Sequence, residues 1–454
     1  MINVVGAGLA GCEAAYQISK LGGKVRLYEM KPGRKSPAHS KDYFAELVCS
    51  NSLRASALTN AVGLLKEEMR RIGSLVMTAA DRAAVPAGAS LAVDRDMFSG
   101  YITEVLRNDK NIEIIEAEIN SLSELEGVTV IATGPLTSGA LYEDIMKLTG
   151  DQLHFFDAAA PIVTKDCINM DKCFFMSRWG KGDDYLNCPM TKEEYDIFYT
   201  NLIGAECAEL SGFEDDSVFE GCLPVEVMAK RGYETLLYGP LKPVGLTDPR
   251  TGKRPYACVQ LRKEDSEGTM FNIVGFQTHL RFPEQKRVFS LIPGLEDIRI
   301  IRYGVMHRNS YINSPGILDR NYRLISNNDI FIAGQMTGVE GYLESAASGL
   351  YAGISAFAQA HGTDMPYLSS KTAVGALAAY ISSWKGSDFQ PMNVNFGIMD
   401  PLEERIKNKK DKNLKIAERS LKRSEILQAG ERYEQYVRYH YSCRQKGRKM
   451  CGSR

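Results

Sequence analysis

Two cysteines have sequence neighbours that could make a thiol reactive. Cys49 lies in FAELVCSNSLRA, where hydroxyl and amide side chains and the cation of Arg54 surround it. Cys222 lies in FEGCLPVEVMAKRG, followed by the carboxylate of Glu226 and the cations of Lys230 and Arg231. Such donors and cations could lower the pKa of a thiol, and a thiolate is the form that attacks carbon. On these features alone, a buried structural cysteine is the commoner interpretation at both positions.

A glycine-rich turn near the N-terminus predicts a dinucleotide site. GAGLAG fits the pattern GxGxxG and lies between an apolar run and a helical stretch, as this fingerprint requires. The glycines allow a tight turn, close approach of a pyrophosphate and close packing of the helix, whose N-terminus then faces the phosphates. A carboxylate 23 residues after the first glycine ends the next predicted strand and could bind ribose hydroxyls. The predicted nucleotide-binding residues are Gly6, Ala7, Gly8, Leu9, Ala10, Gly11 and Glu29.

Two later segments favour FAD over a nicotinamide cofactor. ATG at 132–134 and AGQMTGVEGYLESAASG at 333–349 each place glycines after a predicted strand. A cofactor that touches the start, middle and end of the chain fits an extended, tightly held FAD better than a dissociable NAD. Either segment alone could instead reflect helix packing, and a glycine turn in an unrelated α/β protein is the alternative for the first. The added cofactor residues are Gly134, Gly334, Gln335 and Gly338.

A parallel sheet is needed to position these residues. Residues 2–6, 24–29, 128–134 and 329–334 are apolar runs typical of strands buried on both faces, and a helix is predicted from the glycine turn to about residue 21. This predicts an α/β fold with a Rossmann-type, doubly wound parallel sheet. Aromatic segments punctuated by Pro and Gly predict antiparallel strands in an inserted α+β domain. The predicted domains are 1–150 (FAD-binding, first part), 151–300 (inserted, on the substrate side, carrying Cys222), 301–365 (FAD-binding, closing part) and 366–454 (helical, with a basic tail).

The composition is that of a globular enzyme. The 454 residues are 44% hydrophobic and 24% charged, and no apolar run approaches the roughly 18 residues of a membrane helix. The N-terminus passes directly into a predicted strand without an export signal, so we expect a cytoplasmic protein. Ten cysteines without a CxxC pair predict reduced thiols and no metal site.

The net charge of −1 conceals a basic C-terminal segment. Residues 401–454 contain 16 Lys and Arg against 7 Asp and Glu, a local charge of +9. A basic helical tail could neutralise RNA phosphates, and a solvated helix face is the alternative.

Longer motifs give the chain a specific family resemblance. Besides GAGLAG, they are AELVCSNSLR, PAGASLAVDRDMFS, EGCLPVE, RPYACVQLRKED, NIVGFQTHLRFPEQKRVF, RYGVMHRNSYINSP, AGQMTGVEGYLESAASGL and FQPMNVNFG. With these motifs the sequence resembles the folate- and FAD-dependent tRNA (uracil-5-)-methyltransferases, the TrmFO family. The family is itself similar to the larger flavoprotein that modifies the tRNA wobble uridine. The segment after about residue 430 lies beyond the resemblance.

The resemblance implies a reaction. FAD is the implied cofactor, 5,10-methylenetetrahydrofolate the carbon donor, NADH or NADPH the reductant, and uridine C5 in the T-loop of tRNA the acceptor, with ribosomal RNA as the alternative substrate. Cys222 is implied as the nucleophile that adds to uracil C6, and Cys49 is the candidate base for the C5 proton. A generic FAD/NAD(P)H oxidoreductase with structural cysteines and a catalytically inactive RNA-binding flavoprotein are alternatives. The oligomeric state stays open.

The resemblance places the recognition segments, although it does not assign each side chain in them. The candidates for folate are His279, His307 and Arg308. The candidates for RNA are Arg178, Lys230 and Arg231, with Lys181 as a further basic residue, and Arg281, Lys286 and Arg287 could face either ligand. Trp179 could stack on a base or pack in the core.

Overall fold

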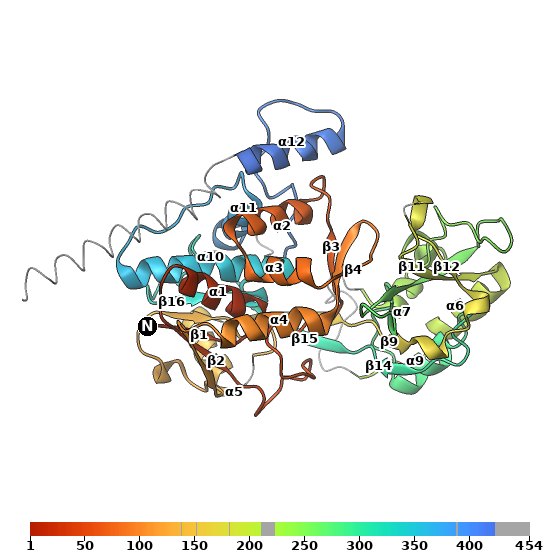
Figure 1. The fold of residues 1–454 in the computed structure, drawn as a ribbon, viewed down its shortest axis with the longest axis horizontal. Coiled ribbons are helices and arrows are strands. Elements are labelled where there is room, and N and C mark those ends of the chain that lie inside the picture. Colours follow the sequence, from red (N-terminus) through yellow and green to blue (C-terminus); the bar gives the residue numbers. More distant parts are fainter. Residues whose placement is uncertain (138, 151, 181, 210–222, 387–388, 423–454) are drawn as a thin grey trace, which may run out of the picture.

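The computed structural model describes residues 1–422 except 138, 151, 181, 210–222 and 387–388, with the side chains of 152, 155 and 308 also undescribed (Figure 1). Cys222 and the tail from residue 423 therefore lie outside the described residues. Figure 1 shows two lobes, one built on a parallel sheet and the other on an antiparallel sheet. Among the described residues no helix combines the length and apolarity needed to cross a membrane.

The parallel sheet confirms the predicted α/β fold. Its order is β16 (Ile330–Ile332), β7 (Thr129–Ile131), β1 (Ile2–Val5), β2 (Val25–Glu29) and β6 (Ile112–Glu116), and every neighbouring pair is parallel. Four of these strands lie in the apolar runs identified from the sequence. The central position of β1 brings its carboxyl end, and hence the glycine turn, to the middle of the sheet edge, where α/β proteins bind ligands.

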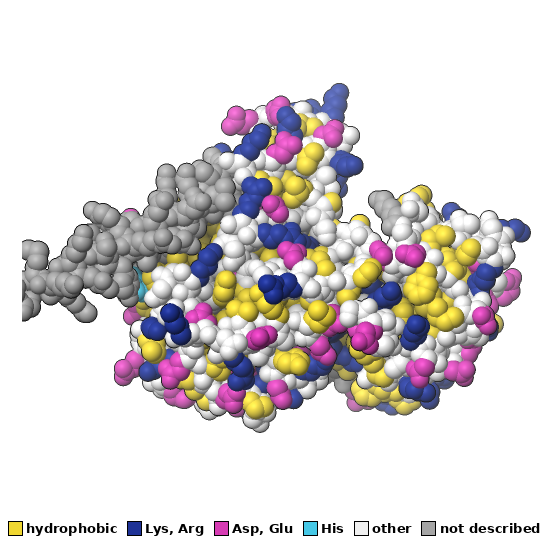
Figure 2. All heavy atoms as spheres, viewed as in Figure 1, with side chains coloured by type: hydrophobic (Ala, Val, Ile, Leu, Met, Phe, Trp, Pro, Cys, Tyr) yellow, Lys and Arg dark blue, Asp and Glu magenta, His cyan; other side chains and the backbone are white. Residues whose placement is uncertain are grey.

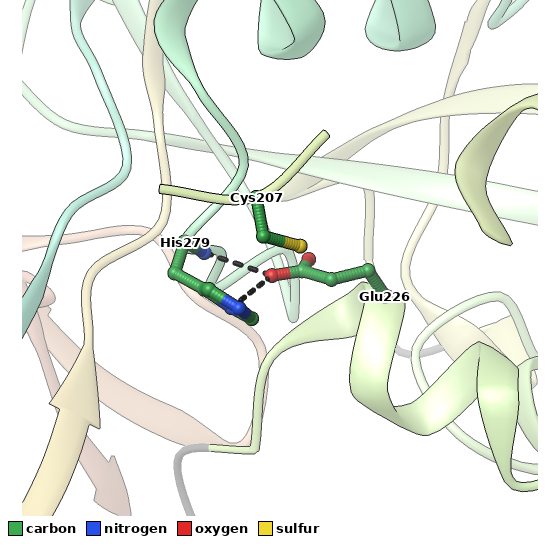
Figure 3. Close-up of side chains that lie close together, drawn as sticks. All are labelled: Cys207, Glu226 and His279. Atoms are coloured by element: carbon green, nitrogen blue, oxygen red, sulfur yellow. Dashed lines mark hydrogen bonds and ion pairs between the residues drawn. The ribbon is translucent and has the colours of Figure 1, made fainter. Parts of the chain in front are cut away.

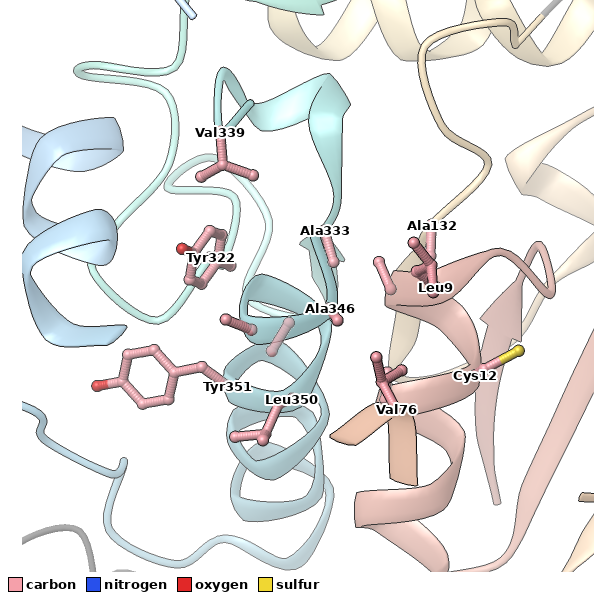
Figure 4. Packing of buried hydrophobic residues seen from close by; sticks show 14 of the residues in the cluster. Leu9, Cys12, Val76, Ala132, Tyr322, Ala333, Val339, Ala346, Leu350 and Tyr351 are labelled. Carbon is pink, nitrogen blue, oxygen red and sulfur yellow. The ribbon is translucent and has the colours of Figure 1, made fainter. Parts of the chain in front are cut away.

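Helices α1 (Leu9–Lys20) and α10 (Tyr342–His361) pack together beside this sheet (Figure 4). The approach requires glycine, because a methyl group at Gly349 would lie 2.0 Å from the carbonyl oxygen of Ala10. The small residues of the segment after β16 therefore serve this packing as well as the site. The other helices of the lobe are α2 (Ala61–Ile72), α3 (Leu75–Arg82), α4 (Arg95–Arg107), α5 (Gly139–Thr149), α11 (Ala373–Ser383) and α12 (Lys409–Lys422).

The C-terminal helices dock on α2 through one buried carboxylate. Glu68, fully buried in α2, accepts hydrogen bonds from the amides of Ala373 and Val374 and from the hydroxyl of Ser420 in α12. The segment from 366 to 422 is mainly helical in its regular elements, as predicted. Figure 2 shows acidic and basic side chains interspersed over the visible face, α12 included.

The inserted region has its own sheet and core. The order is β10 (Phe174–Phe175), β11 (Tyr185–Met190), β12 (Ala257–Lys263), β13 (Met270–Ile273), β9 (Ile162–Thr164) and β14 (Ile300–Arg302), with antiparallel neighbours throughout. Helices α6 (Lys192–Ile203), α7 (Val225–Lys230), α8 (Thr235–Tyr238) and α9 (Phe282–Phe289) accompany it. The antiparallel strands expected here are confirmed, whereas the domain boundaries at 150, 300 and 365 stay a prediction.

Two smaller sheets complete the fold. Strands β8 (Gln152–Ala158) and β15 (Met306–Ile312) form an antiparallel pair where the chain enters and leaves the inserted region. Strands β3 (Ser52–Ala55), β5 (Ser90–Val93) and β4 (Ala84–Val85) form the other, directly after the Cys49 segment. These two pieces bring residues from both lobes to one place.

Candidate functional site

A cavity of about 460 Å³ lies at the carboxyl ends of the parallel strands. Most of the cofactor residues predicted from the sequence line it, namely Gly6, Ala7, Gly8, Leu9, Ala10, Glu29, Gly134, Gly334 and Gln335. Gly11 and Gly338 do not, and their role is in packing. A methyl group at Gly11 would lie 1.8 Å from the carbonyl oxygen of Gly6, and one at Gly338 would lie 2.5 Å from the ring of Phe389.

The glycine turn leaves room for a phosphate group. Gly6 has a φ of 96°, and a methyl group there would lie 2.7 Å from the carbonyl oxygen of Ala132. Gly8 is the N-cap of α1 and has no capping side chain, and a methyl group on it would meet no protein atom within 4 Å. The N-terminus of α1 therefore faces open space with its amides available, which is the arrangement that binds pyrophosphate.

Glu29 holds this turn as well as lining the cavity. One carboxylate oxygen accepts a hydrogen bond from the amide of Ala7 at 2.7 Å, and the other accepts from the amide of Lys31 at 3.1 Å. The side chain is 7% exposed. The contact of Glu29 with a ribose, predicted from the sequence, stays a prediction. Its hydrogen bond to the glycine turn is an additional role.

Cys49 lies where two cavities meet. It lines the large cavity and also a neighbouring one of about 110 Å³, which shares Ser50 and Gln277 and is otherwise lined by Ala160, Arg262, Asn272, Val274 and Gly275. The sulfur is 3.6 Å from the carbonyl oxygen of Ala158 at the end of β8. A thiol on the nucleotide-binding lobe thus faces side chains of the inserted sheet.

Three side chains fix the backbone of the Cys49 segment. The hydroxyl of Tyr342, the first residue of α10, lies 2.6 Å from the amide nitrogen of Cys49, which donates to it. Arg95 donates to the carbonyl oxygen of Cys49 at 2.9 Å, and Arg302 donates to that of Val48. Sequence reasoning did not single out these residues, although Tyr342 and Arg95 lie in the quoted motifs GVEGYLES and VDRDMF.

The pKa of the Cys49 thiol is raised, contrary to the expectation from its sequence neighbours. Burial is the largest cause and Asp157 adds to it, while the cations of Arg95 and Arg302 act in the opposite direction. The cation expected to help, Arg54, is instead paired with the buried carboxylate of Glu344 in α10. The expectation of a lowered pKa was wrong, because neighbours in sequence are not the charges nearest the sulfur.

Two further titratable groups line the large cavity near this thiol. Burial and the charge of Asp157 raise the pKa of Glu340, which accepts a hydrogen bond from Gln335. Burial and Arg302 lower the pKa of His307, so its imidazole is neutral at pH 7. His307 is one of the residues predicted to bind folate. The side chain of Arg308, predicted beside it, lies outside the described part of the chain, and only its backbone pairing with Phe156 is defined.

His279, also predicted to bind folate, does not line the cavity and belongs to a buried cluster (Figure 3). Its Nδ1 lies 2.6 Å from Oε1 of Glu226, and its amide donates to the same oxygen at 2.8 Å. Burial alone would lower the pKa of His279, but contacts with Cys207 and Glu226 raise it to about 9. The ligand atoms of Cys207, Glu226 and His279 lie within 4.8 Å of one another, a spacing that could hold a metal ion; the expectation of no metal stays untested.

The predicted RNA contacts are dispersed. The guanidinium of Arg178 is directed into the protein, donating to Gln260 at 3.1 Å and to the carbonyl oxygens of Lys242 and Val244 at 2.5 and 2.8 Å. Lys230 and Arg231 are exposed at the end of α7. None of the three lines the cavity. The predicted nucleophile, Cys222, falls among the residues that the structure leaves undescribed.

Comparison with known proteins gives consistent matches over most of the chain. The family model described as Glucose inhibited division protein A matches residues 1–364. Methylenetetrahydrofolate--tRNA-(uracil-5-)-methyltransferase TrmFO of Acetivibrio thermocellus is 59% identical over 423 residues, covering 93% of this chain and 97% of the relative. The protein of the same name from Staphylococcus aureus is 58% identical over 423 residues, covering 92% and 97%. The solved structure of Aquifex aeolicus GidA in its form II crystal has a TM-score of 0.68 at 16% identity, covering 96% of this chain and 73% of that one, and supports the fold.

Proposed function

Because the chain belongs to the TrmFO family, we propose that it transfers a one-carbon unit from 5,10-methylenetetrahydrofolate to C5 of a uridine in tRNA, with FAD as its cofactor. The product is 5-methyluridine, and the T-loop is the proposed position. The observation that carries the proposal within the structure is the place of Cys49, at the junction of the nucleotide cavity and the cavity of the inserted sheet.

The lining of the large cavity fits FAD. The open N-terminus of α1 suits the pyrophosphate, and Glu29 suits a ribose. When bound and reduced, FAD supplies the electrons that convert the transferred carbon into a methyl group. We propose NADH or NADPH as the reductant that restores the reduced cofactor, acting by transient binding, because the sequence contains no second complete dinucleotide fingerprint.

The protein's own part is thiol chemistry on the pyrimidine. Addition of a thiolate to uracil C6 makes C5 nucleophilic, and loss of the C5 proton later allows the thiolate to leave. We assign the addition to Cys222 and the removal of the C5 proton to Cys49. Because its pKa is raised, the Cys49 thiol acts as a base only after it has given its own proton to solvent water, and the cations of Arg95 and Arg302 stabilise the thiolate so formed.

The other residues predicted to bind folate or RNA differ in where their side chains lie. We propose His307 for the folate, because its side chain lines the cavity that also holds Cys49. We propose Lys230 and Arg231 for RNA phosphates, because both are exposed. His279 and Arg178 contact other side chains of the protein, Glu226 and Gln260. We propose that they position neighbouring residues and do not contact the ligands. A cytoplasmic location, with tRNA as substrate, completes the proposal.

The test is transfer of labelled carbon. The purified, FAD-loaded protein is incubated with NADH or NADPH, methylene-labelled methylenetetrahydrofolate and either tRNA or ribosomal RNA transcripts, and the labelled nucleoside is mapped by mass spectrometry. We expect label at C5 of a T-loop uridine. Label only in ribosomal RNA would select the alternative substrate, and oxidation of the reductant without label in any RNA would favour a generic oxidoreductase.

A matched pair of variants tests the role of the thiol. Cys49→Ala should slow the transfer about 1000-fold, whereas Cys167→Ala, which alters a buried thiol of the inserted region, should retain it. Both variants should keep their FAD. Equal activity in the two variants would show that Cys49 has no part in the reaction.

A further inference from the structure

Trp179 is an aromatic side chain that packing does not explain. Its side chain is 68% exposed, so the core position that the sequence left open is excluded. The residue also adopts a left-handed backbone conformation, with φ 64° and ψ 27°, which is unfavourable for a bulky residue. A strained, exposed aromatic residue indicates a requirement other than folding.

The chain around Trp179 is held firmly in place. Its amide donates to the carbonyl oxygen of Gly245 at 2.9 Å, and Gly245 itself has a φ of 83°. A methyl group at Gly245 would lie 2.9 Å from the indole ring, so the ring rests directly on this glycine. The preceding Arg178 anchors the turn through its three hydrogen bonds. The ring is therefore presented at a fixed position while remaining largely exposed.

A series of contacts connects this position to the reactive thiol. Arg178 donates to Gln260 in β12, and Arg262, two residues further along the same face of that strand, donates to Ser50 at 2.9 Å. Gln260 and Arg262 are about 7 Å apart along the strand. Ser50 follows Cys49, so hydrogen bonds through β12 connect the turn of Trp179 to the segment that carries the thiol.

Charges of both signs flank Trp179 in the sequence, with Arg178 and Lys181 on either side of it and two aspartates after them. Asp183 is exposed a few residues later, and Asp184 accepts a hydrogen bond from the amide of Gly88 on the nucleotide-binding lobe. The face of a nucleobase is uncharged and stacks on indole, so this mixed charge does not oppose a base as the ligand of the ring. The contact with Gly88 also fixes the turn at the boundary between the lobes.

We propose that Trp179 stacks on an unpaired base of the RNA substrate. The inference rests on the proposed function and adds a recognition residue to it. Stacking on an aromatic side chain is tolerant of base identity, and its loss weakens binding by roughly 5- to 150-fold. It holds the RNA strand without contacting the reacting ring.

The chain offers a direct reporter, because it contains only two tryptophans. In the FAD-loaded Trp384→Phe variant, Trp179 is the remaining tryptophan, and we expect its emission to change saturably on titration with a tRNA transcript. The matched Trp179→Phe variant retains Trp384, 42% exposed and close to Tyr380, and should show no comparable change. Unchanged emission of Trp179 on binding tRNA would overturn the proposal, as would a change that depends only on protein concentration and thus indicates a second copy of the chain.

Kinetics supply the second arm of the test. Trp179→Ala should raise KM for tRNA about 10-fold with kcat largely retained, and Trp179→Phe should restore most of the affinity. The slope of affinity against salt should stay unchanged, in contrast to Lys230→Ala, which removes a cation. Wild-type KM in Trp179→Leu, with its FAD content and melting temperature preserved, would refute stacking. Failure of the wild-type protein to methylate tRNA would instead refute the proposed function.

Discussion

The two lobes hold their buried carboxylates in different ways. In the nucleotide-binding lobe, Glu68 accepts hydrogen bonds from two backbone amides and one hydroxyl, and burial raises its pKa to about 7. In the inserted lobe, Glu226 pairs with His279, and contacts with Cys207 and Glu226 together raise the pKa of that imidazole to about 9 against the opposing effect of burial. One lobe therefore buries a hydrogen-bonded acid and the other an ion pair, so the lobes should respond to pH in different ranges.

The largest effect is expected at Cys49, where the lobes meet. Cys49→Ala should reduce the rate of methyl transfer about 1000-fold, because it removes the proposed base from the junction of the cavities. FAD absorbance and the melting temperature should be close to those of the wild type. Rapid-quench measurement of 5-methyluridine formation checks this, and loss of FAD from the variant would show that the thiol serves the nucleotide-binding lobe alone.

A pair of glycine variants separates packing from ligand binding within the nucleotide-binding lobe. Gly11→Ala should lower the free energy of unfolding by about 3 kcal/mol or more, because the new methyl group would collide with the Gly6 carbonyl. Gly8→Ala should fold normally, because its methyl group meets no protein atom, yet bind FAD at least about tenfold more weakly. Denaturant titration and FAD titration measure the two effects. Equal behaviour of the two variants would contradict the division of roles.

The ion pair of the inserted lobe predicts a loss of stability at alkaline pH. The raised pKa of His279 stabilises the folded state fully below pH 6.5, and this contribution disappears as the pH rises through about 9. The wild-type free energy of unfolding should fall over this range by an amount on the order of 3 kcal/mol at most, which Cys207 and Glu226 share. Glu226→Gln should be less stable near pH 6 and show a weaker dependence, because only the contact with Cys207 then raises the pKa of His279. If the free energy of unfolding of the variant changed with pH as that of the wild type does, the ion pair would contribute nothing to stability.

Glu68 predicts a loss of stability as the pH rises from about 4.5 through about 7. Its carboxyl is protonated more readily in the folded than in the unfolded chain, so its contribution is full below pH 4.5 and is lost as the pH rises through about 7. The difference between wild type and Glu68→Gln should change by about 3 kcal/mol across this range, less if the surrounding helices relax. Thermal melting of both proteins at closely spaced pH values measures it. A constant difference would mean that Glu68 is ionised without penalty.

The sequence predicted best those features that the backbone determines. The glycine turn, the strands before it and after it, and the position of Glu29 all follow from local patterns, and they line the cavity as expected. Side-chain partners were harder to predict, since Arg54 pairs with Glu344, 290 positions away, and so leaves the thiol to Arg95 and Arg302.

The inserted lobe shows the same difference between its strands and its side-chain partners. Its antiparallel strands could be predicted, but the partners of its charged residues could not. His279 was expected at the folate and is paired with Glu226, and Arg178 was expected at the RNA and instead anchors the turn of Trp179. Each of these pairings joins different strands or helices, and a local pattern contains no information about such partners.

The central claim is that carbon passes from folate to uridine at the junction of the two lobes. The direct test is a single-turnover reaction of the FAD-loaded, reduced protein with methylene-labelled methylenetetrahydrofolate and a tRNA transcript, quenched in time and digested to nucleosides. The account predicts label in 5-methyluridine from the T-loop, formed by the wild type and not by Cys49→Ala. Oxidation of the reduced protein with all label remaining in small molecules would contradict it.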